Sequence, residues 1–302
     1  MWWFGAFLAL AIGGTATQPV YRDVSVAPRY HAPYSSVVVF GDSLVDNGNG
    51  TWQLTNHTWP ADKAYFDGRF SNGETWVEVF AEKLGVPCVK DIAYGGATVN
   101  NSRVQGYTGY DSDIKVPDVL SQISQHLGKS GCADADALYI VSGGSNDAFF
   151  GMQHSADVAK FAESVVESLV AAAHRLARAG ARHLAIPTLL PTGLSPYGVS
   201  FLDDASRATL RNYTDAFNKA VNATTNITVI DLHTVAQRIY DNPAKHGLTV
   251  LHEACLQGTL KPETGPRKLC SNPDAHTYWD LYHPTKRMHE LLAEGAFCAF
   301  SK

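Results

Sequence analysis

The chain has 302 residues, of which 45% are hydrophobic and 18% are charged, a composition typical of a globular protein with enough apolar material for a core. Its formal net charge is −5, and neither sign is concentrated in a long run. Because nucleic-acid binding needs a concentrated basic surface, this balance argues against nucleic acid as a natural partner. Nothing in it would attract an anionic membrane surface.

The first segment is predicted to be a signal peptide. Residues 2–12 are apolar and small residues follow them, with Gly14 and Ala16 suited to the −3 and −1 positions of a cleavage site. A buried N-terminal helix is the alternative, and a membrane anchor is disfavoured because about 20 apolar residues are needed to span a bilayer. We therefore expect a signal peptide at 1–16, an exported domain at 17–302 and no stable membrane insertion.

Two further patterns agree with export. Six Asn-x-Ser/Thr triplets give glycosylation candidates at Asn49, Asn56, Asn100, Asn212, Asn222 and Asn226. Cys255 and Cys270 bracket a short segment rich in Gly, Pro and Lys without helix or strand periodicity, so we expect a disulfide to join them. The pairing of Cys88, Cys132 and Cys298 stays open.

Short β-rich runs then alternate with longer amphipathic stretches. The predicted strands are 37–40, 86–93, 137–141, 182–187 and 227–232. The predicted helices are 74–84, 117–127, 156–179, 203–221, 234–240 and a last one that starts after Pro284, a residue suited to a first-turn position. This alternation predicts right-handed crossovers and a parallel sheet covered on both faces. We expect one α/β domain, a three-layer α/β/α structure with a parallel sheet of about five strands, which binds ligands at the carboxyl ends of its strands.

Two short blocks of interest follow the first two predicted strands. Ser43 lies in Gly-Asp-Ser-Leu, where a strand-to-helix turn would point its hydroxyl into the ligand crevice, although a helix N-cap is the other interpretation. Gly96 lies in Gly-Gly-Ala-Thr, where a glycine lets a backbone N–H approach a ligand closely. Alone, such a glycine pair is more often a turn.

Two more blocks follow the third strand and precede the last helix. Asn146 lies in Gly-Ser-Asn-Asp, and its amide donates hydrogen bonds without titrating, which suits an oxyanion; an Asx turn is the structural alternative. Asp280 stands three residues before His283, so that its carboxylate can fix the imidazole tautomer and leave the other nitrogen free as a base. Each block is weak alone, but the four together indicate a serine hydrolase.

In this order the four blocks resemble those of the GDSL/SGNH hydrolases. The similarity covers essentially the whole chain after the predicted signal peptide and includes Gly-Arg-Phe-Ser-Asn-Gly at 68–73. The resemblance implies a flavodoxin-like SGNH hydrolase fold, with Ser43 as the nucleophile and His283 as a general base that Asp280 orients.

The resemblance also implies an oxyanion hole made by the N–H groups of Ser43 and Gly96 and the side chain of Asn146. Asp91 departs from the family pattern, in which Asn is usual at this position, but the position is structural. The chain lacks a Gly-x-Ser-x-Gly elbow and His-Glu-x-x-His or Cys-x-x-Cys spacings. We therefore expect neither a metal nor a cofactor.

Within the family, the chain looks most like the fungal secreted acetyl esterases of carbohydrate esterase family sixteen. The cues are the run at 42–49, Thr55-Asn56, Trp59-Pro60 and 68–73. The resemblance implies a secreted, extracellular enzyme that deacetylates plant cell-wall oligosaccharides and acts as a monomer. A lipase or lysophospholipase on the same fold and a noncatalytic carbohydrate-binding protein are the alternatives.

Aromatic residues crowd the segment after the predicted nucleophile. The candidate substrate-binding residues are Trp52, Trp59, Tyr65 and Phe66, with Phe70 in the same segment. Some of these rings must belong to the core. Those that do not could form a flat surface for sugar rings or acyl chains of an ester substrate.

Overall fold

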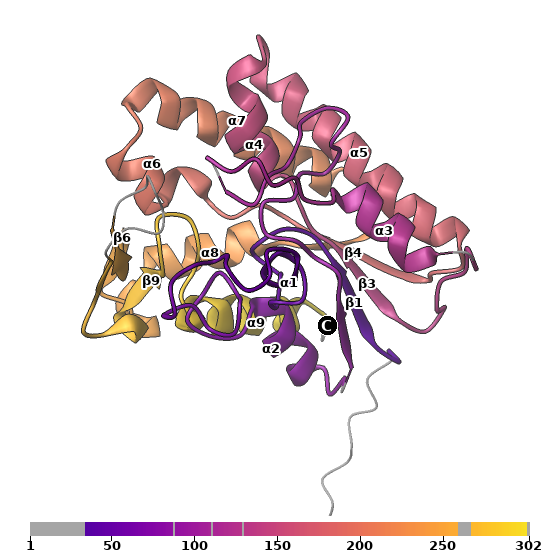
Figure 1. Cartoon of the computed structure of the whole chain (residues 1–302), viewed down its shortest axis with the longest axis horizontal. Coiled ribbons are helices and arrows are strands. Elements are labelled where there is room, and N and C mark those ends of the chain that lie inside the picture. The colour runs from indigo at the N-terminus through magenta and orange to yellow at the C-terminus, as the bar shows by residue number, and fades with distance from the viewer. Residues whose placement is uncertain (1–33, 87, 110, 129, 259–266, 301–302) are drawn as a thin grey trace, which may run out of the picture. The chain divides into compact units, whose positions relative to one another are not determined.

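The computed structural model describes residues 34–300 except residues 87, 110, 129 and 259–266, so the predicted signal peptide at 1–16 lies outside the described residues. The central sheet contains β1 (Val37–Phe40), β2 (Val89–Asp91), β3 (Leu138–Val141), β4 (His183–Pro187) and β5 (Thr228–Ile230). All its pairings are parallel, in the order β2-β1-β3-β4-β5 (Figure 1). The predicted α/β fold with a five-stranded parallel sheet is confirmed.

Helices cover both faces of this sheet. One face is covered by α3 (Val119–Leu127), α5 (Val158–Arg178) and α7 (Asp204–Asn222), and the other by α2 (Trp76–Lys83), α8 (Leu232–Asp241) and α9 (Lys286–Phe300). In Figure 1 the first group lies above the sheet and the second below it. None of the helices in the described part of the chain is long and apolar enough to cross a membrane.

The two central strands, β1 and β3, are apolar at every position because they are buried on both faces of the sheet. Every side chain of β1 is at most 1% exposed. Val38 and Phe40 pack in the core with α3, α5 and α7, whereas Val37 and Val39 pack in the core with α2, α8 and α9. Successive side chains of a strand point to opposite faces, so a strand buried on both faces must be apolar throughout.

The predicted elements differ from the structure mainly at their ends. The predicted strand 86–93 shrinks to the three residues of β2, which is an edge strand paired only with β1. The last helix starts after Pro284, as predicted, but Pro284 does not lie in its first turn, because α9 begins at Lys286. Thr285 occupies the capping position, where its hydroxyl accepts a hydrogen bond from the N–H of Met288 at 3.2 Å.

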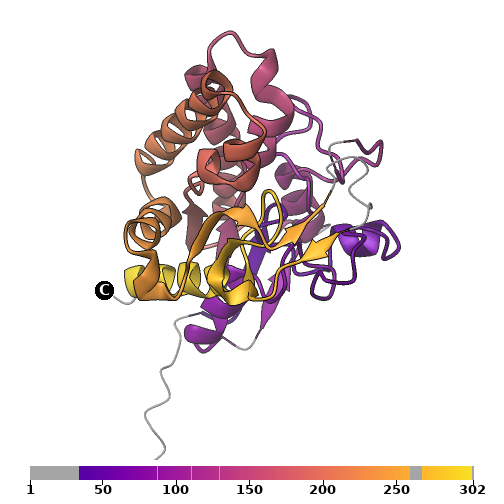
Figure 2. The ribbon, with the colours of Figure 1, turned by 90° about the vertical axis from the view of Figure 1, so that its left-hand side faces the viewer.

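Several short elements were not predicted, because they have too few residues to show a period. They are α1 (Thr51–Leu54), α4 (Ser145–Gly151), α6 (Pro196–Ser200), β6 (Val250–Ala254), β7 (Leu256–Gln257), β8 (Lys268–Leu269), β9 (His276–Tyr278) and 3₁₀ turns at Met152–His154, Thr192–Leu194, Pro243–His246 and Pro273–Ala275. Strand β6 pairs with β9 in parallel and β7 pairs with β8 in antiparallel fashion. Figure 2 turns this small β-region toward the viewer.

A disulfide joins the two ends of the β7–β8 region. Cys255 and Cys270 are bonded with an S–S distance of 2.00 Å and a sequence separation of 15. The N–H of Cys255 donates to the carbonyl of Tyr278 at 3.0 Å, and the N–H of Cys270 donates to the carbonyl of Cys255 at 2.8 Å. The bond therefore joins the end of β8 to the start of β7, next to β9. Cys88, Cys132 and Cys298 are free and exposed.

This arrangement predicts the effect of removing the disulfide. Cys270→Ser should lower the free energy of unfolding by about 3 kcal/mol, because the unfolded chain regains the entropy of an open loop of this length. Urea denaturation of the oxidised proteins measures the change. The control is Cys298→Ser, at an exposed free cysteine, which should leave the midpoint unchanged. Equal midpoints for the two variants would contradict the prediction.

Candidate active site

Ser43 lies on the turn that follows β1. The carbonyl of Asp42 accepts hydrogen bonds from the N–H groups of Val45 and Asp46 at 3.1 and 3.0 Å, so the chain reverses immediately after the strand. The expected strand-to-helix connection is not formed here, because the next helix, α1, begins only at Thr51. The turn nevertheless places the half-buried Ser43 in the wall of a pocket at the carboxyl end of the sheet.

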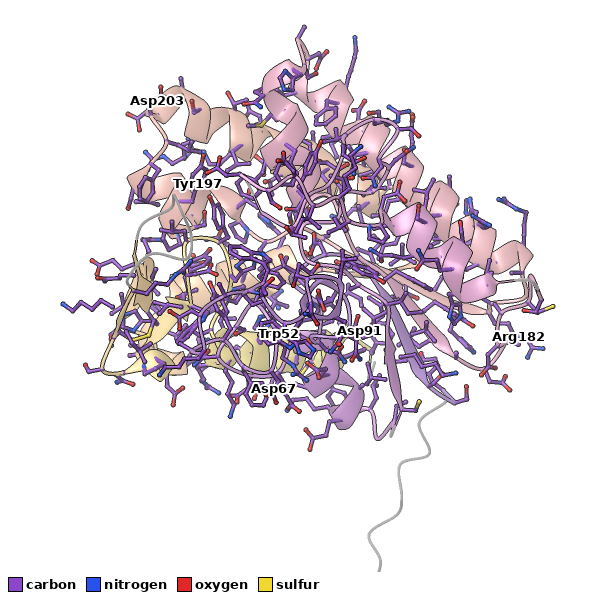
Figure 3. All side chains as sticks on the ribbon, in the orientation of Figure 1. Trp52, Asp67, Asp91, Arg182, Tyr197 and Asp203 are labelled. Carbon is purple, nitrogen blue, oxygen red and sulfur yellow. A yellow bond between two sulfur atoms is a disulfide. The ribbon has the colours of Figure 1, made fainter. Side chains whose placement is uncertain are left out.

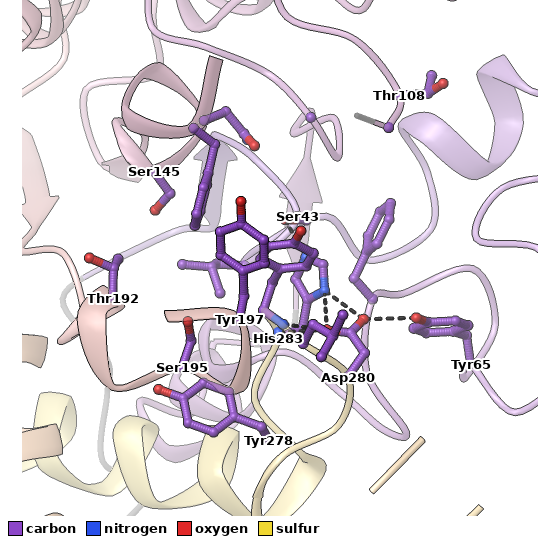
Figure 4. Close-up of a pocket in the computed structure, with 18 of the residues that line it drawn as sticks. Ser43, Tyr65, Thr108, Ser145, Thr192, Ser195, Tyr197, Tyr278, Asp280 and His283 are labelled. Carbon is purple, nitrogen blue, oxygen red and sulfur yellow. Dashed lines mark hydrogen bonds and ion pairs between the residues drawn. The ribbon is translucent and has the colours of Figure 1, made fainter. Parts of the chain in front are cut away.

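The hydroxyl of Ser43 meets His283, which is 240 residues away in sequence. His283 Nε2 lies 2.8 Å from Ser43 Oγ, and His283 Nδ1 lies 2.7 Å from Asp280 Oδ2 (Figure 4). Because a carboxylate accepts and an imidazole Nδ1–H donates, this contact fixes the tautomer that leaves Nε2 as the acceptor for the serine proton. The three predicted residues therefore lie in the order that a nucleophile, a base and an orienting acid require.

Asp280 is held by the same short turn that carries His283. Its Oδ1 accepts hydrogen bonds from the N–H groups of Tyr282 and His283, each at 2.8 Å. Burial alone would raise the pKa of Asp280, but the charge of the neighbouring imidazole and these hydrogen bonds outweigh it, so that the pKa lies below its usual value. The carboxylate is thus ionised where the imidazolium has to form.

The two predicted oxyanion donors, Gly96 and Asn146, line the same pocket as Ser43. Gly96 has a φ of +87°, and a Cβ at this position would collide with the carbonyl of Tyr107, so only glycine fits. Asn146 lies in the first turn of α4, where its Nδ2 donates to the carbonyl of Ala97 at 3.0 Å. An amide nitrogen carries two hydrogens, so the second is available to a ligand in the pocket.

A buried carboxylate that sequence reasoning missed connects the loop of Ser43 to the loop of Gly96. Asp46 is fully buried, and its Oδ1 accepts from the N–H groups of Gly48 at 3.0 Å and Gly50 at 3.2 Å. Its Oδ2 accepts from Thr51 at 3.0 Å and from Gly95 at 2.8 Å. Four bonds to one side chain therefore fix the relative positions of two loops that follow different strands.

Two further buried side chains act in the same way. Asp147 accepts from the N–H of Val99 at 3.0 and 3.3 Å, which ties α4 to the loop after β2. Gln122 of α3 accepts from the N–H of Gly41 at 2.8 Å and donates to its carbonyl at 2.9 Å. The sequence signal for Asp147 was its position directly after Asn146, a predicted site residue. Gln122 offered no signal.

Burial changes the pKa of three carboxyl groups, those of Asp42, Asp91 and Asp147. Burial raises the pKa of Asp42 to about 6 and that of Asp147 to about 7, and it raises the pKa of Asp91 well above its usual value. Asp91 accepts from the N–H groups of Asn47 and Ala93 at 3.2 and 2.8 Å. This carboxyl therefore braces the backbone, as expected for a structural position.

Two of the four aromatic residues predicted to bind substrate line the pocket, and two do not. Trp59 and Tyr65 are in its wall. Trp52, labelled in Figure 3, instead stacks on His57, with ring centroids 5.2 Å apart, and packs against Gly68. Phe66 is 41% exposed and carries the guanidinium of a neighbouring arginine over its ring. Trp52 and Phe66 are therefore not among the described residues that line this pocket, and a role for them in substrate binding stays a prediction.

Other aromatic residues complete the pocket from distant parts of the chain. Phe70 is 5% exposed and packs on the ring of His283 with centroids 5.1 Å apart. The further aromatic residues in the wall are Tyr107, Phe149, Phe150, Tyr197, Tyr278 and Tyr282. These residues come from loops and short elements that were not predicted, so no local sequence signal connected them to the site.

One group of potential metal ligands occurs in the described part of the chain. The ligand atoms of Cys255, Cys270 and His276 lie within 4.8 Å of one another. The two sulfur atoms are bonded to each other, so they offer no thiolate to a metal in this state. No second cluster of this kind occurs among the residues that the structure describes.

The chain belongs to the family of GDSL-like lipases and acylhydrolases, whose model matches residues 37–296. A GDSL esterase/lipase of Arabidopsis thaliana is 26% identical over 321 aligned residues, which cover 86% of this chain and 89% of the relative. The thermolabile hemolysin of Vibrio parahaemolyticus is 26% identical over 281 residues, which cover 86% of this chain and 62% of the hemolysin. The chain is therefore a carboxylic ester hydrolase.

The fold is also similar to that of a solved structure. LAE5, an alpha/beta hydrolase enzyme from the metagenome of Lake Arreo in Spain, superposes with a TM-score of 0.50 at 16% sequence identity. The superposition covers 90% of this chain and 97% of that chain. At this identity the likeness concerns the fold alone, and the assignment of site residues depends on the geometry described above.

The geometry predicts that Ser43 is the nucleophile. Ser43→Ala should fold normally but lower kcat by about four orders of magnitude or more, because no other group forms the acyl-enzyme. Hydrolysis of p-nitrophenyl acetate and labelling by an organophosphonate measure the loss. Ser130→Ala, at an exposed serine, should keep both activities. A Ser43→Ala variant with a tenth of the wild-type turnover would disprove the assignment.

The acid–base pair predicts how the rate depends on pH. Since the pKa of Asp280 is lowered, the carboxylate stays ionised while His283 titrates, and kcat/KM should fall with a slope of one as falling pH protonates His283. Asp280→Asn should lower kcat by about 10⁴-fold, because the imidazole loses the partner that fixes its tautomer. Initial rates from pH 4 to 9 test both statements, and a flat profile from pH 4 to 8 would contradict a histidine base.

Proposed function

We propose that this protein is a secreted esterase that removes acetyl groups from plant cell-wall oligosaccharides. The observation that carries the proposal is the make-up of the pocket beside Ser43. Its walls combine aromatic rings with hydroxyl groups, whereas its aliphatic residues are the four leucines Leu44, Leu190, Leu256 and Leu281. A sugar has faces of C–H bonds that stack on rings and edges of hydroxyl groups that form hydrogen bonds.

Rings and hydroxyl groups occur together around the reactive serine. Tyr65 lies on the side of Asp280, while Thr192 and Ser195 lie on the other side of Ser43, where Tyr197 of α6 also contributes its ring (Figure 4). A long acyl chain would instead need a continuous aliphatic surface. The pocket therefore favours a small acyl group on a polar, ring-shaped alcohol.

The chemistry proceeds through an acyl-enzyme on Ser43. His283 Nε2 takes the hydroxyl proton as Ser43 Oγ attacks the ester carbonyl, and the imidazolium is stabilised by Asp280. The N–H groups of Ser43 and Gly96 and the amide of Asn146 stabilise the oxyanion, at about 3 kcal/mol for each donor. The intermediate collapses, and His283 protonates the departing alcohol oxygen. Water then repeats the sequence on the acyl group and releases the carboxylic acid.

A second hollow beside the catalytic pocket supports the proposal that the alcohol part of the substrate contains several sugars. The two hollows share Tyr107, Phe149 and Phe150 as walls. The second hollow is also lined by polar side chains, among them Gln105 and Gln153. Rings next to amide groups suit a further sugar residue of the same oligosaccharide. A substrate of several sugars would thus contact both hollows.

Export is part of the proposal, and the glycosylation candidates support it. The acceptor residues Asn49, Asn56, Asn212, Asn222 and Asn226 are exposed, and Asn100 is half-buried. An exposed acceptor is a requirement for N-glycosylation of a secreted protein. Together with the disulfide and the apolar, small-residue pattern at 1–16, this supports a secreted glycoprotein.

The proposed substrate class predicts a preference for short acyl chains. Along a series of p-nitrophenyl esters, kcat/KM should fall from acetate to octanoate, and acetate should be released from acetylated xylo-oligosaccharides. Phe150→Ala should raise KM for the oligosaccharide more than for p-nitrophenyl acetate, because only the larger substrate would extend past Phe150 into the second hollow. Preference for octanoate, with no acetate released from the sugar, would favour a lipase or lysophospholipase instead.

A further inference from the structure

Tyr65 contacts the acid of the catalytic group directly. Its hydroxyl donates a hydrogen bond to Asp280 Oδ2 at 2.7 Å (Figure 4). The same oxygen accepts from His283 Nδ1 at 2.7 Å. The chain of hydrogen bonds therefore extends from Ser43 through His283 and Asp280 to a phenol that sequence analysis had assigned to substrate binding.

The direction of the phenolic hydrogen bond follows from its second partner. Arg267 Nη1 lies 3.2 Å from the hydroxyl oxygen of Tyr65, and its guanidinium carbon lies 5.8 Å from the centre of the tyrosine ring. A guanidinium can only donate. The oxygen of Tyr65 is therefore the acceptor toward Arg267, and its proton is directed to Asp280.

The two oxygens of Asp280 are thus fixed by different means. Oδ1 is held by the backbone N–H groups of Tyr282 and His283, while Oδ2 is held by the hydroxyl of Tyr65. The imidazole Nδ1 of His283 lies near both oxygens, 2.9 Å from Oδ1 and 2.7 Å from Oδ2. Without the phenol, Oδ2 would lose one of its two donors in a site where the carboxylate is 5% exposed. The carboxylate could then rotate about its Cβ–Cγ bond relative to the imidazole.

We propose that Tyr65 is a positioning residue of the esterase, which holds the Asp280 carboxylate in register with His283, and that Arg267 orients its hydroxyl. The proposal rests on the catalytic roles assigned above to Ser43, His283 and Asp280. Tyr65 acts through Asp280, and Arg267 acts through Tyr65.

The surroundings of Tyr65 suit such a role. Its ring packs edge-on against Phe70 and Trp279, with centroids 6.4 and 6.3 Å away. Arg267 belongs to the segment that the Cys255–Cys270 disulfide closes. Because the ring contacts do not involve the hydroxyl, Tyr65→Phe removes the hydrogen bond and leaves the packing in place.

The loss of the hydrogen bond to Asp280 should change the pH profile of Tyr65→Phe in a characteristic way. A hydrogen bond from Tyr65 withdraws negative charge from the Asp280 carboxylate. When this donor is removed, the carboxylate stabilises the imidazolium of His283 more strongly, and the base then loses its proton only at higher pH. The acid limb of the pH profile should therefore move upward, an effect that loss of packing would not produce.

The experiment measures kcat, KM and the pH profile of Tyr65→Phe with p-nitrophenyl acetate. We expect kcat to fall by about tenfold, the scale of one hydrogen bond to a charged group, with KM unchanged and the acid limb shifted to higher pH. The control is Tyr240→Phe, which also loses a phenolic hydrogen bond of 2.7 Å, but to Tyr278 and not to Asp280. It should keep the wild-type acid limb.

Arg267→Gln and the double variant complete the test. If Arg267 acts through the phenol, the double variant should be no slower than Tyr65→Phe alone, so that the two effects are not additive. The proposal would be overturned if Tyr65→Phe kept both the kcat and the acid limb of the wild-type pH profile. It would also be overturned if kcat fell while the acid limb stayed at the wild-type pH. Either result, alongside an inactive Ser43→Ala, would leave the catalytic assignment intact; an active Ser43→Ala would overturn that assignment itself.

Discussion

The buried carboxylate of Asp46 is the constraint on which the site depends. Its four hydrogen bonds reach N–H groups of the loop after β1 and the N–H of Gly95 in the loop after β2. The nucleophile and one oxyanion donor belong to these two loops, so their separation is set by one side chain. Burial raises the pKa of Asp46, and the N–H groups around it offset part of the cost of burying its charge.

The strand order explains why these loops meet at all. In the sheet β2-β1-β3-β4-β5, the chain first adds a strand on one side of β1 and then returns to the other side. A crevice forms at such a reversal, outside the carboxyl ends of the strands. Ser43 follows β1 and Asn146 follows β3, on the two sides of the reversal. The small β-region and the turn of Asp280 and His283, which both come from the C-terminal part of the chain, close the crevice.

Much of this arrangement was predictable because it depends on local pattern. Apolar runs marked β1 and β3, and short blocks at element ends marked Ser43, Gly96 and Asn146, which the structure brings into one pocket with Asp280 and His283. The aromatic residues could not be sorted in this way, since ring type says nothing about the direction in which a loop points a side chain. The partner of Tyr65 lies 215 residues away, so only tertiary structure reveals it.

The turn from Asp280 to His283 has one more consequence. The acid, the base and the two N–H groups that hold the acid all lie within four successive residues. Their mutual geometry is therefore independent of how much chain separates them from Ser43. Insertions and deletions between the block of Asn146 and the segment that the Cys255–Cys270 disulfide closes can change the walls of the pocket while the proton-transfer pair is kept intact. The scaffold thus allows the range of accepted alcohols to evolve separately from the chemistry that cleaves the ester.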